Sequence, residues 1–371
     1  MISRGVSQIC AIASMAIVST ASQPASAASP ARGASRISLT ATYIVRGIDN
    51  ATHTLYVEDT TYGALRQSQD WGLTFSKNKG FPEGVDSVGR ILSFGSRLYV
   101  VGRDRVTGLV GVYRAAPASG DQPFSWSGPT HTVVRPGKVL PTDFSADGRF
   151  LYLAEYGDPV GGPSLYRSAD GVTWQRTFGP DSGLRHIHAV APDPYVPGSV
   201  WMTVGDGVPA SIWRSAAYGA PGTWQVVVRS SSWQSVQISF TQQRIYLAAD
   251  THKHTMFVID RKTMTPRLGT AQYFQRIRPP STTSGALYLW NAFYGAVDPS
   301  TGVYYCVAND ESGQGRADRQ GGSWQGLFVV RRLGGQVQVL DQGGININMN
   351  GQVFIGGGRV WAGQWSAPLI H

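Results

Sequence analysis

Two histidines separated by a single residue, His186 and His188, stand in the apolar run from Leu184 to Val190. Side chains alternate between the two faces of a β-strand, so both imidazoles are expected on the same face. Asp206 follows the next apolar run. A neutral imidazole accepts a proton near pH 7 and an imidazolium donates one, which suits general acid–base chemistry. His188 is the leading catalytic candidate and His186 the second; structural hydrogen bonding to the Asp206 loop is the alternative.

A second histidine pair, His252 and His254, follows Asp250. Imidazole nitrogens are ligands of Zn²⁺ and Mn²⁺, so four histidines could surround one divalent ion if the two pairs face each other. Oxygen ligands near Asp310 could serve Ca²⁺ instead. The sequence requires no cofactor, and a solvated loop is the alternative for the second pair. The metal ligands that the sequence offers are His186, His188, His252 and His254.

Polar residues also stand at the ends of other apolar runs. Tyr156 and Tyr294 are the candidate catalytic partners of the histidines, because a phenol can donate or accept a proton. Guanidinium, amide, imidazole and carboxylate groups can bind the hydroxyls and carboxylates of a sugar. The candidate substrate-binding residues are Arg103, Arg105, Glu155, Asp206, His252, Asn291, Asn346 and Asn348.

The elements that must position these residues are short strands. Runs rich in Val, Ile, Leu, Tyr and Trp alternate with Gly, Pro, Asp and Asn turns, and no long amphipathic helix is evident. Equivalent runs recur about every 50 residues. The predicted second strands of the repeats begin at Leu55, Leu98, Leu151, Val200, Ile245, Val303 and Val353. The sequence therefore predicts an all-β domain of seven repeats, with six repeats as the alternative.

One phrase occurs twice, as Ser68-Gln-Asp70-Trp-Gly72-Leu-Thr74-Phe75 and as Ser168-Ala-Asp170-Gly171-Val-Thr173-Trp174. Its carboxylate can accept backbone N–H groups in a tight turn, and its glycine permits a positive φ. The phrase resembles the Asp-box, the bacterial neuraminidase repeat of secreted, sialidase-like β-propellers. The resemblance implies a single seven-bladed β-propeller whose Asp-boxes lie between outer strands and whose ligand site lies on the opposite face. We expect residues 36–43 to close the ring as an N-terminal strand.

The first residues predict export. Arg4 precedes an apolar stretch, and Ala25-Ser-Ala27 has the small-residue pattern of a cleavage site. We expect a signal peptide over residues 1–27, a flexible leader over 28–37 and the propeller over 38–371. No later run reaches the roughly 20 apolar residues of a membrane span. The mature protein is expected to be secreted or periplasmic, monomeric and without a membrane span.

The charge balance favours an anionic partner. The chain has 32 Lys and Arg residues against 23 Asp and Glu residues, and arginine supplies most of the excess. Guanidinium groups bind carboxylates and sulfates through two hydrogen bonds, so an exported, arginine-rich protein fits an anionic polysaccharide or glycan. A basic surface that only aids solubility is the alternative. Export and the lack of a recognised reader motif argue against nucleic acid.

The residues depart from the sialidase pattern that the resemblance implies. Sialidases bind the substrate carboxylate through three arginines and use a tyrosine nucleophile assisted by a glutamate. Here Arg46 stands in Tyr43-Ile-Val-Arg46-Gly, where the usual Arg-Ile-Pro is absent, and the chain has only four glutamates. A sialidase-like glycoside hydrolase that uses Glu155 with Asp158 or Asp206 remains an alternative.

The polar residues are more similar to those of propeller polysaccharide lyases, including ulvan lyases. Such enzymes split a uronic-acid glycoside by β-elimination, with His, Tyr and Arg in the site. The similarity implies His188 as base or acid, Tyr156 or Tyr294 as its partner, and Arg103 with Asn291 on the uronate carboxylate. We therefore predict a secreted enzyme that cleaves an acidic, uronic-acid-containing polysaccharide, with a non-catalytic glycan- or protein-binding propeller as a further alternative.

Overall fold

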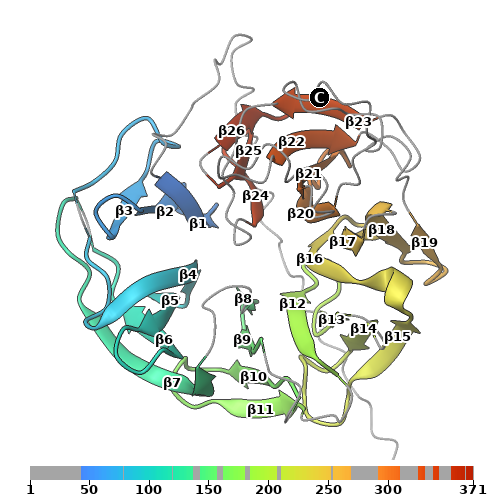
Figure 1. Ribbon diagram of the computed structural model, residues 1–371, viewed down its shortest axis with the longest axis horizontal. Helices are drawn as coiled ribbons and strands as arrows, with labels where there is room; N and C mark the ends of the chain where they lie inside the picture. Colours follow the sequence, from blue (N-terminus) through green and yellow to red (C-terminus); the bar gives the residue numbers. More distant parts are fainter. Residues whose placement is uncertain are drawn as a thin grey trace, which may run out of the picture. The chain divides into compact units, whose positions relative to one another are not determined.

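Short apolar runs separated by turn residues form antiparallel strands throughout the computed structural model. The structure describes residues 43–77, 79–118, 120–136, 143–156, 162–179, 184–206, 210–251, 254–268, 291–309, 325–330, 337–341, 352–363 and 365–370. Within these ranges the strands form seven separate sheets of three or four strands each. We call the sheets blades 1 to 7 in chain order (Figure 1).

The strands of the first four blades lie consecutively along the chain. Blade 1 contains β1 (Tyr43–Asp49), β2 (Thr54–Asp59) and β3 (Ala64–Ser68). Blade 2 contains β4 (Val85–Phe94), β5 (Arg97–Asp104), β6 (Leu109–Ala115) and β7 (Trp126–Pro136). Blade 3 contains β8 (Asp143–Ala146), β9 (Leu151–Ala154), β10 (Leu165–Ser168) and β11 (Gln175–Phe178). Blade 4 contains β12 (His186–Pro192), β13 (Val200–Gly205), β14 (Ser211–Ser215) and β15 (Gln225–Arg229).

The last three blades follow the same order. Blade 5 contains β16 (Ser235–Phe240), β17 (Arg244–Thr251), β18 (His254–Asp260) and β19 (Pro266–Leu268). Blade 6 contains β20 (Asn291–Val297), β21 (Tyr304–Asn309), β22 (Gln325–Val330) and β23 (Val337–Asp341). Blade 7 contains β24 (Val353–Gly356), β25 (Arg359–Ala362) and β26 (Trp365–Pro368). The described residues include one short 3₁₀ helix, η1 (Ser231–Trp233), and no helix long and apolar enough to cross a membrane.

The first strands of the blades form a closed ring. β1 contacts β4, and the contacts continue through β8, β12, β16, β20 and β24 back to β1 (Figure 1). The backbone N–H of Val45 in blade 1 also donates to the carbonyl oxygen of Gly363, which follows β25 in blade 7, at 2.9 Å. This arrangement is a seven-bladed β-propeller, so the predicted fold and blade number are confirmed. Except for Tyr43, which begins β1, the segment expected to close the ring lies outside the described residues.

One strand prediction is wrong. Residues 353–356 were expected as a second strand, but they form β24, the innermost described strand of blade 7. Gly357 and Gly358 both have positive φ, at 61° and 70°, and turn the chain back at once. Two such residues are the backbone requirement of a tight hairpin turn, so the second position in the blade falls to Arg359–Ala362.

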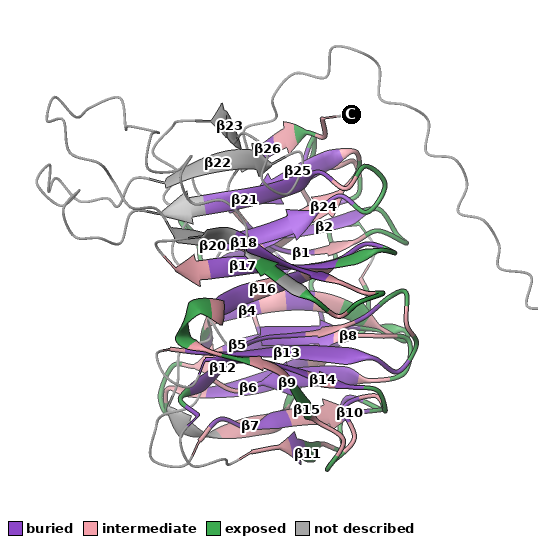
Figure 2. Ribbon diagram, turned by 90° about the vertical axis from the view of Figure 1, so that its right-hand side faces the viewer, coloured by how far each residue is buried: buried purple, intermediate pink, exposed green. Residues whose placement is uncertain are grey.

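Apolar side chains fill the space between neighbouring blades. Tyr99 and Val112 of blade 2 pack with Phe144 and Leu153 of blade 3 in one buried cluster, against which Trp174 lies. Full burial of each large apolar side chain contributes roughly 1.5–3 kcal/mol to folding. Figure 2 shows buried residues along the strands and exposed residues in the connecting loops. The core therefore lies between the blades, and the polar loops are left at the edges of the strands.

Polar groups link the first strands of several blades. The carboxylate of Asp143 accepts hydrogen bonds from Gln352 Nε2 at 2.9 Å and from the backbone N–H of Val190 at 2.8 Å. The side-chain amide of Gln237 both donates to Val353 O and accepts from Val353 N, at 2.8 and 3.1 Å. These bonds join blades 3, 4, 5 and 7, so polar side chains occupy the centre of the ring.

The strand order separates two faces of the ring. In blade 4, His186 at the start of the first strand pairs with Gly205 at the end of the second, whereas Ser215 at the end of the third pairs with Val200 at the start of the second. We call the edge at which first strands begin the site face, and the edge at which third strands end the turn face. The Asp-box phrases follow third strands, so they belong to the turn face.

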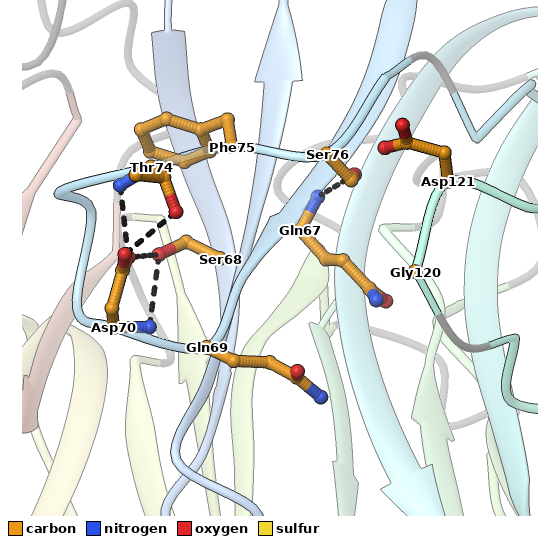
Figure 3. A pocket seen from close by; sticks show the side chains of 9 residues that line it. All are labelled: Gln67, Ser68, Gln69, Asp70, Thr74, Phe75, Ser76, Gly120 and Asp121. Carbon is orange, nitrogen blue, oxygen red and sulfur yellow. Dashed lines mark hydrogen bonds between the residues drawn. The ribbon is translucent and has the colours of Figure 1, made fainter.

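The two Asp-box turns are closed by their own side chains. In the first, Asp70 accepts from Thr74 N at 2.9 Å (Figure 3). Ser68 Oγ accepts from Gly72 N at 2.7 Å. In the second, Asp170 accepts from Thr173 N at 2.7 Å. These bonds supply the partners that the sequence pattern predicts. Membership of the neuraminidase-repeat family stays a prediction.

Candidate functional site

Three of the predicted site residues meet on the site face of blade 4. His186 is the first residue of β12, and Asp206 directly follows β13. The distance from His186 Nε2 to Asp206 Oδ2 is 3.0 Å, and that from His188 Nε2 to Asp206 Oδ1 is 3.5 Å. Both imidazoles are almost fully buried, whereas 30% of the Asp206 side chain is exposed. The carboxylate therefore lies between two buried bases and solvent.

A bulge in β12 sets the direction of the His188 ring. Ile187 pairs with Val204 and Ala189 pairs with the adjacent Thr203, so His188 is an extra residue in the ladder. Bulges of this kind re-aim a side chain. The simple alternation expected from the sequence is thus interrupted, yet the two imidazole rings still lie side by side, with centroids 4.6 Å apart.

The His188 ring lies against the backbone of the neighbouring strand at Gly205. A Cβ atom at this position would be only 1.9 Å from His188 Cε1. Gly205 is therefore required here because of the close approach of the ring, whatever the backbone angles. The absence of a side chain at Gly205 gives the imidazole its place beside Asp206.

The hydrogen bond of Nδ1 determines which ring nitrogen of His188 carries the proton. Nδ1 lies 3.0 Å from the backbone carbonyl oxygen of Ser235, the first residue of β16 in blade 5. A carbonyl oxygen only accepts, so Nδ1 carries a proton and donates it to Ser235. In the neutral imidazole, Nε2 is then a lone pair that faces Asp206.

Tyr156 completes the ring cluster. Its phenol stacks on His186 with centroids 4.0 Å apart and planes 19° apart, and it lies nearly parallel to His188 at 6.3 Å. Burial raises the pKa of Tyr156, and the negative charge of Asp206 adds to the effect. Burial lowers the pKa of His186. At neutral pH the cluster therefore pairs a protonated phenol with an uncharged imidazole.

Polar side chains from two blades surround Asp206. Arg185 Nη1 lies 3.3 Å from Asp206 Oδ2, and Gln234 Nε2 donates to Asp206 Oδ1 at 2.7 Å. The same Gln234 nitrogen donates to Asp250 Oδ2 at 2.5 Å. Burial alone would raise the pKa of Asp206, but the imidazoles of His186 and His188, when they carry a proton on Nε2, outweigh it and hold that pKa well below its usual range.

Three other predicted site residues come from other blades. Tyr294 is buried in the apolar cluster shared by blades 5, 6 and 7, where burial and the charges of Asp143 and Asp250 raise its pKa. Arg103 is paired with Asp86 in blade 2, with Nε–Oδ1 and Nη2–Oδ2 distances of 3.0 and 3.1 Å. Arg105 is exposed beyond the end of β5.

Glu155 and Arg46 also have partners away from the histidines. Glu155 follows β9, where its backbone N–H donates to Ser164 O. Burial raises the pKa of Tyr166, and the charge of Glu155 adds to the effect. Arg46, considered above for the sialidase pattern, is buried and donates from Nε to Glu58 Oε2 at 2.8 Å. Its guanidinium is thus engaged within blade 1.

The remaining predictions fall where side chains are not described. His252, Asn346 and Asn348 lie outside the described residues, as does Asp158. Asn291 and His254 begin β20 and β18, but only their backbone is described. The proposed group of four histidines is thus described only in part. Where side chains are described, the group suited to a metal ion is His186, His188 and Asp206, whose ligand atoms lie within 4.8 Å of one another.

Sequence reasoning missed Gln234 and Ser235 of blade 5 and Gly205 of blade 4. Gln234 and the Ser235 carbonyl reach the cluster from the start of β16, and Gly205 makes room for it. The signal that could have found the first two is positional, because the start of each first strand lies on the site face. Gln234 and Ser235 occupy in blade 5 the place that Arg185 and His186 occupy in blade 4.

A pocket of about 320 Å³ lies at the first Asp-box, in blade 1, on the turn face. Its lining includes Ser68, Asp70, Thr74 and Asp121 (Figure 3). The polar atoms of Asp70 and Asp121 are already engaged, Asp70 with Thr74 and Asp121 with the backbone N–H of Lys77. These groups hold the turn, and we assign the pocket no chemistry.

Comparison with known proteins places the fold. No family model and no curated protein matches the chain. The GH74 xyloglucanase from Xanthomonas campestris has a similar structure, with a TM-score of 0.56 and 14% identity over 89% of this chain and 52% of that one. An ancestral GH74 enzyme matches with a TM-score of 0.51 and 12% identity, over 87% and 44%. The chain thus spans about half the length of these enzymes, and the likeness shows a β-propeller fold.

Proposed function

We propose that this propeller is a carbohydrate-active enzyme, a polysaccharide lyase that cleaves an acidic, uronic-acid-containing polysaccharide at the His186–His188–Asp206 cluster. The observation that supports it best is the stack of Tyr156 on His186, which sets a protonated phenol beside an uncharged imidazole. Neighbouring groups whose environments push their pKa values apart are suited to separate acid and base roles. The fold itself can carry polysaccharide chemistry, since one similar structure is a xyloglucanase.

The proposed reaction needs three functions from the protein. A cation neutralises the uronate carboxylate, a base removes the C5 proton, and an acid protonates the leaving oxygen as the C4–O bond breaks and the C4=C5 double bond forms. The imidazole pair is the base and the Tyr156 phenol is the acid. Arg185, whose side chain is 57% exposed and lies beside the cluster, takes the carboxylate role first expected of Arg103, which is paired with Asp86 in blade 2.

The test is product analysis. The purified chain is incubated with a panel of uronic-acid polysaccharides, and absorbance of the unsaturated product is followed together with new reducing ends. The proposal predicts that both rise in step and that His188→Ala abolishes the rise. Reducing ends without unsaturated product would show hydrolysis, and tight binding with no product from any polysaccharide would show a non-catalytic module.

A second candidate, a retaining glycoside hydrolase, is favoured by one observation. A single amide nitrogen, Gln234 Nε2, bonds to both Asp206 and Asp250, so the two carboxylates lie close together. Such closeness fits the roughly 5 Å carboxylate separation of retaining enzymes better than the roughly 6.5–9.5 Å of inverting ones. The same product analysis separates this candidate from the lyase, since hydrolysis gives no unsaturated product.

We further propose that the chain is exported and that an anionic glycan is its partner. Cleavage after Ala27 would leave a mature, monomeric protein that begins at Ala28. Mass spectrometry of the protein from the culture medium or periplasm tests the cleavage, and gel filtration tests the monomer. An intact N-terminus on the cell-associated protein would contradict the export proposal.

A further inference from the structure

We infer that the two imidazole Nε2 atoms and the Asp206 carboxylate bind one divalent transition-metal ion, with Zn²⁺ as the probe of choice. The inference concerns the same cluster as the proposed function, but binding of the ion does not require the proposed reaction. It starts from the distances of 3.0 and 3.5 Å between the imidazole nitrogens and the carboxylate oxygens. Ligands about 2.0–2.1 Å from a tetrahedral ion lie roughly 3.3 Å from one another, which fits this spacing.

The hydrogen bonds of the cluster leave acceptor atoms facing each other with no proton or cation between them. His188 Nδ1 donates its proton in a hydrogen bond to Ser235 O. His188 Nε2 therefore presents a lone pair to Asp206 Oδ1, which is also an acceptor. His186 Nε2 is buried, and no group among the described side chains completes a hydrogen bond of good geometry with it, although Asp206 is near. Acceptors that face one another repel unless a proton or a metal ion lies between them.

The surroundings of the three ligands resemble the outer shell of a metal site. A metal-bound histidine commonly donates its other N–H to a backbone carbonyl, as His188 does to Ser235. The Asp206 carboxylate is oriented by Gln234, and Gly205 leaves room for the His188 ring. Two imidazoles and one carboxylate suit Zn²⁺ and related first-row ions better than Ca²⁺ or Mg²⁺, which prefer oxygen ligands alone.

Arg185 is the group that competes with an ion. Its guanidinium lies 3.3 Å from Asp206 Oδ2, but 57% of the side chain is exposed, so it can leave the carboxylate without losing a buried position. With an ion bound, the imidazoles would be ligands, Tyr156 would be left as the proton-transfer group, and the ion would share with Arg185 the neutralisation of a substrate carboxylate. The proposed reaction would thereby gain a metal requirement.

The experiment measures binding of ZnCl₂ to the chelator-treated, full mature chain by calorimetry and by competition with a chromophoric chelator. We expect one Zn²⁺ per chain, with affinity reduced at least about 100-fold in His188→Ala and in Asp206→Asn, and about 10–100-fold in Gly205→Ala. Co²⁺ substitution should give a visible absorption band that these variants lose. Bound Zn²⁺ should also raise the unfolding temperature of the wild type.

Two control variants test whether zinc binds at other histidines. His131→Gln alters a partly buried histidine, whose ring lies against Tyr166 with centroids 4.4 Å apart, and should leave zinc binding unchanged. The double variant of His252 and His254 removes the other histidine pair. If that double variant loses the zinc and the His188 variant keeps it, or if the wild type binds none, the inference is overturned. Lyase activity that persists without metal would support the proposed function whatever the result for zinc. Zinc binding without any product would contradict the proposed function but not the zinc site.

Discussion

Asp170 and Asp206 are both held as carboxylates, but by partners of opposite kinds. Asp170, in the second Asp-box, accepts from the backbone N–H groups of Thr173 and Val172 at 2.7 and 2.8 Å, and these bonds lower its pKa to about 2. Asp206 lies among side chains instead, between the imidazoles of blade 4 and the amide of Gln234 from blade 5.

The difference separates a carboxylate that holds a turn from one that we propose to be reactive. Backbone donors in a turn cannot leave Asp170 unless the turn opens, so its charge holds a fold element in place. The partners of Asp206 are side chains that can change protonation, rotate or accept a metal ion. The same residue type therefore belongs to a turn on one face and to a cluster of titratable side chains on the other.

The largest expected effect tests this contrast directly. Asp206→Asn should reduce kcat/KM for the acidic polysaccharide by about 10²- to 10⁴-fold, because the charge that organises both imidazoles is lost. Asp170→Asn should leave kcat/KM unchanged. Initial rates of unsaturated-product formation measure both variants, and equal losses in the two would remove the distinction between the carboxylates.

A second pair of variants compares a glycine beside the cluster with a glycine in open space. Gly205→Ala would place a Cβ against His188, and a displaced catalytic ring of this kind costs about 10²-fold in activity. Gly148→Ala, where a Cβ meets nothing within 4 Å, should have no such effect. Activity and zinc affinity are measured on both proteins, with circular dichroism to confirm folding. Full activity in Gly205→Ala would show that the position of the ring is unimportant.

The Asp-box should show the reverse behaviour, with lost stability and intact activity. Asp170→Ala removes the acceptor of several turn hydrogen bonds and should lower the free energy of unfolding by about 1–2 kcal/mol. Urea denaturation measures the change. Glu83→Gln, which neutralises an exposed carboxylate without such turn bonds, is the control and should unfold like the wild type. An unchanged midpoint for Asp170→Ala would show that the carboxylate does not hold the turn.

The smallest expected effect is the pH dependence of that stability. The folded-state pKa of Asp170, about 2, lies below the unfolded value of about 3.9. Its contribution is therefore fully present above about pH 4 and is lost as the pH falls through about 2. The stability difference between wild type and Asp170→Asn should accordingly shrink over this range. A difference that stays constant from pH 5 to pH 2 would show that the carboxylate charge is irrelevant to the turn.

Sequence patterns predicted the structure correctly where the interacting residues lie close together in the chain. The Asp-box phrase predicts its own hydrogen bonds because donor and acceptor lie within a few residues. Apolar runs such as 245–250 become second strands because their composition and flanking turns suffice. Val353–Gly356 was misplaced because its apolar pattern is the same in a first or a second strand. The position of this strand is decided by the hairpin at Gly357 and by the contacts of β24 with β1 and β20.

The sequence by itself determined the propeller repeat, the Asp-box turns and the nearness of His186 to His188. All of these depend on residues close together in the chain. Only the tertiary structure decided that Ser235, 47 residues beyond His188, fixes the proton of that ring, and that Gln234 binds Asp206. It also decided that Arg103 belongs to Asp86 rather than to the cluster. Such partners are set by how one blade packs on the next, which spacing within a blade does not encode.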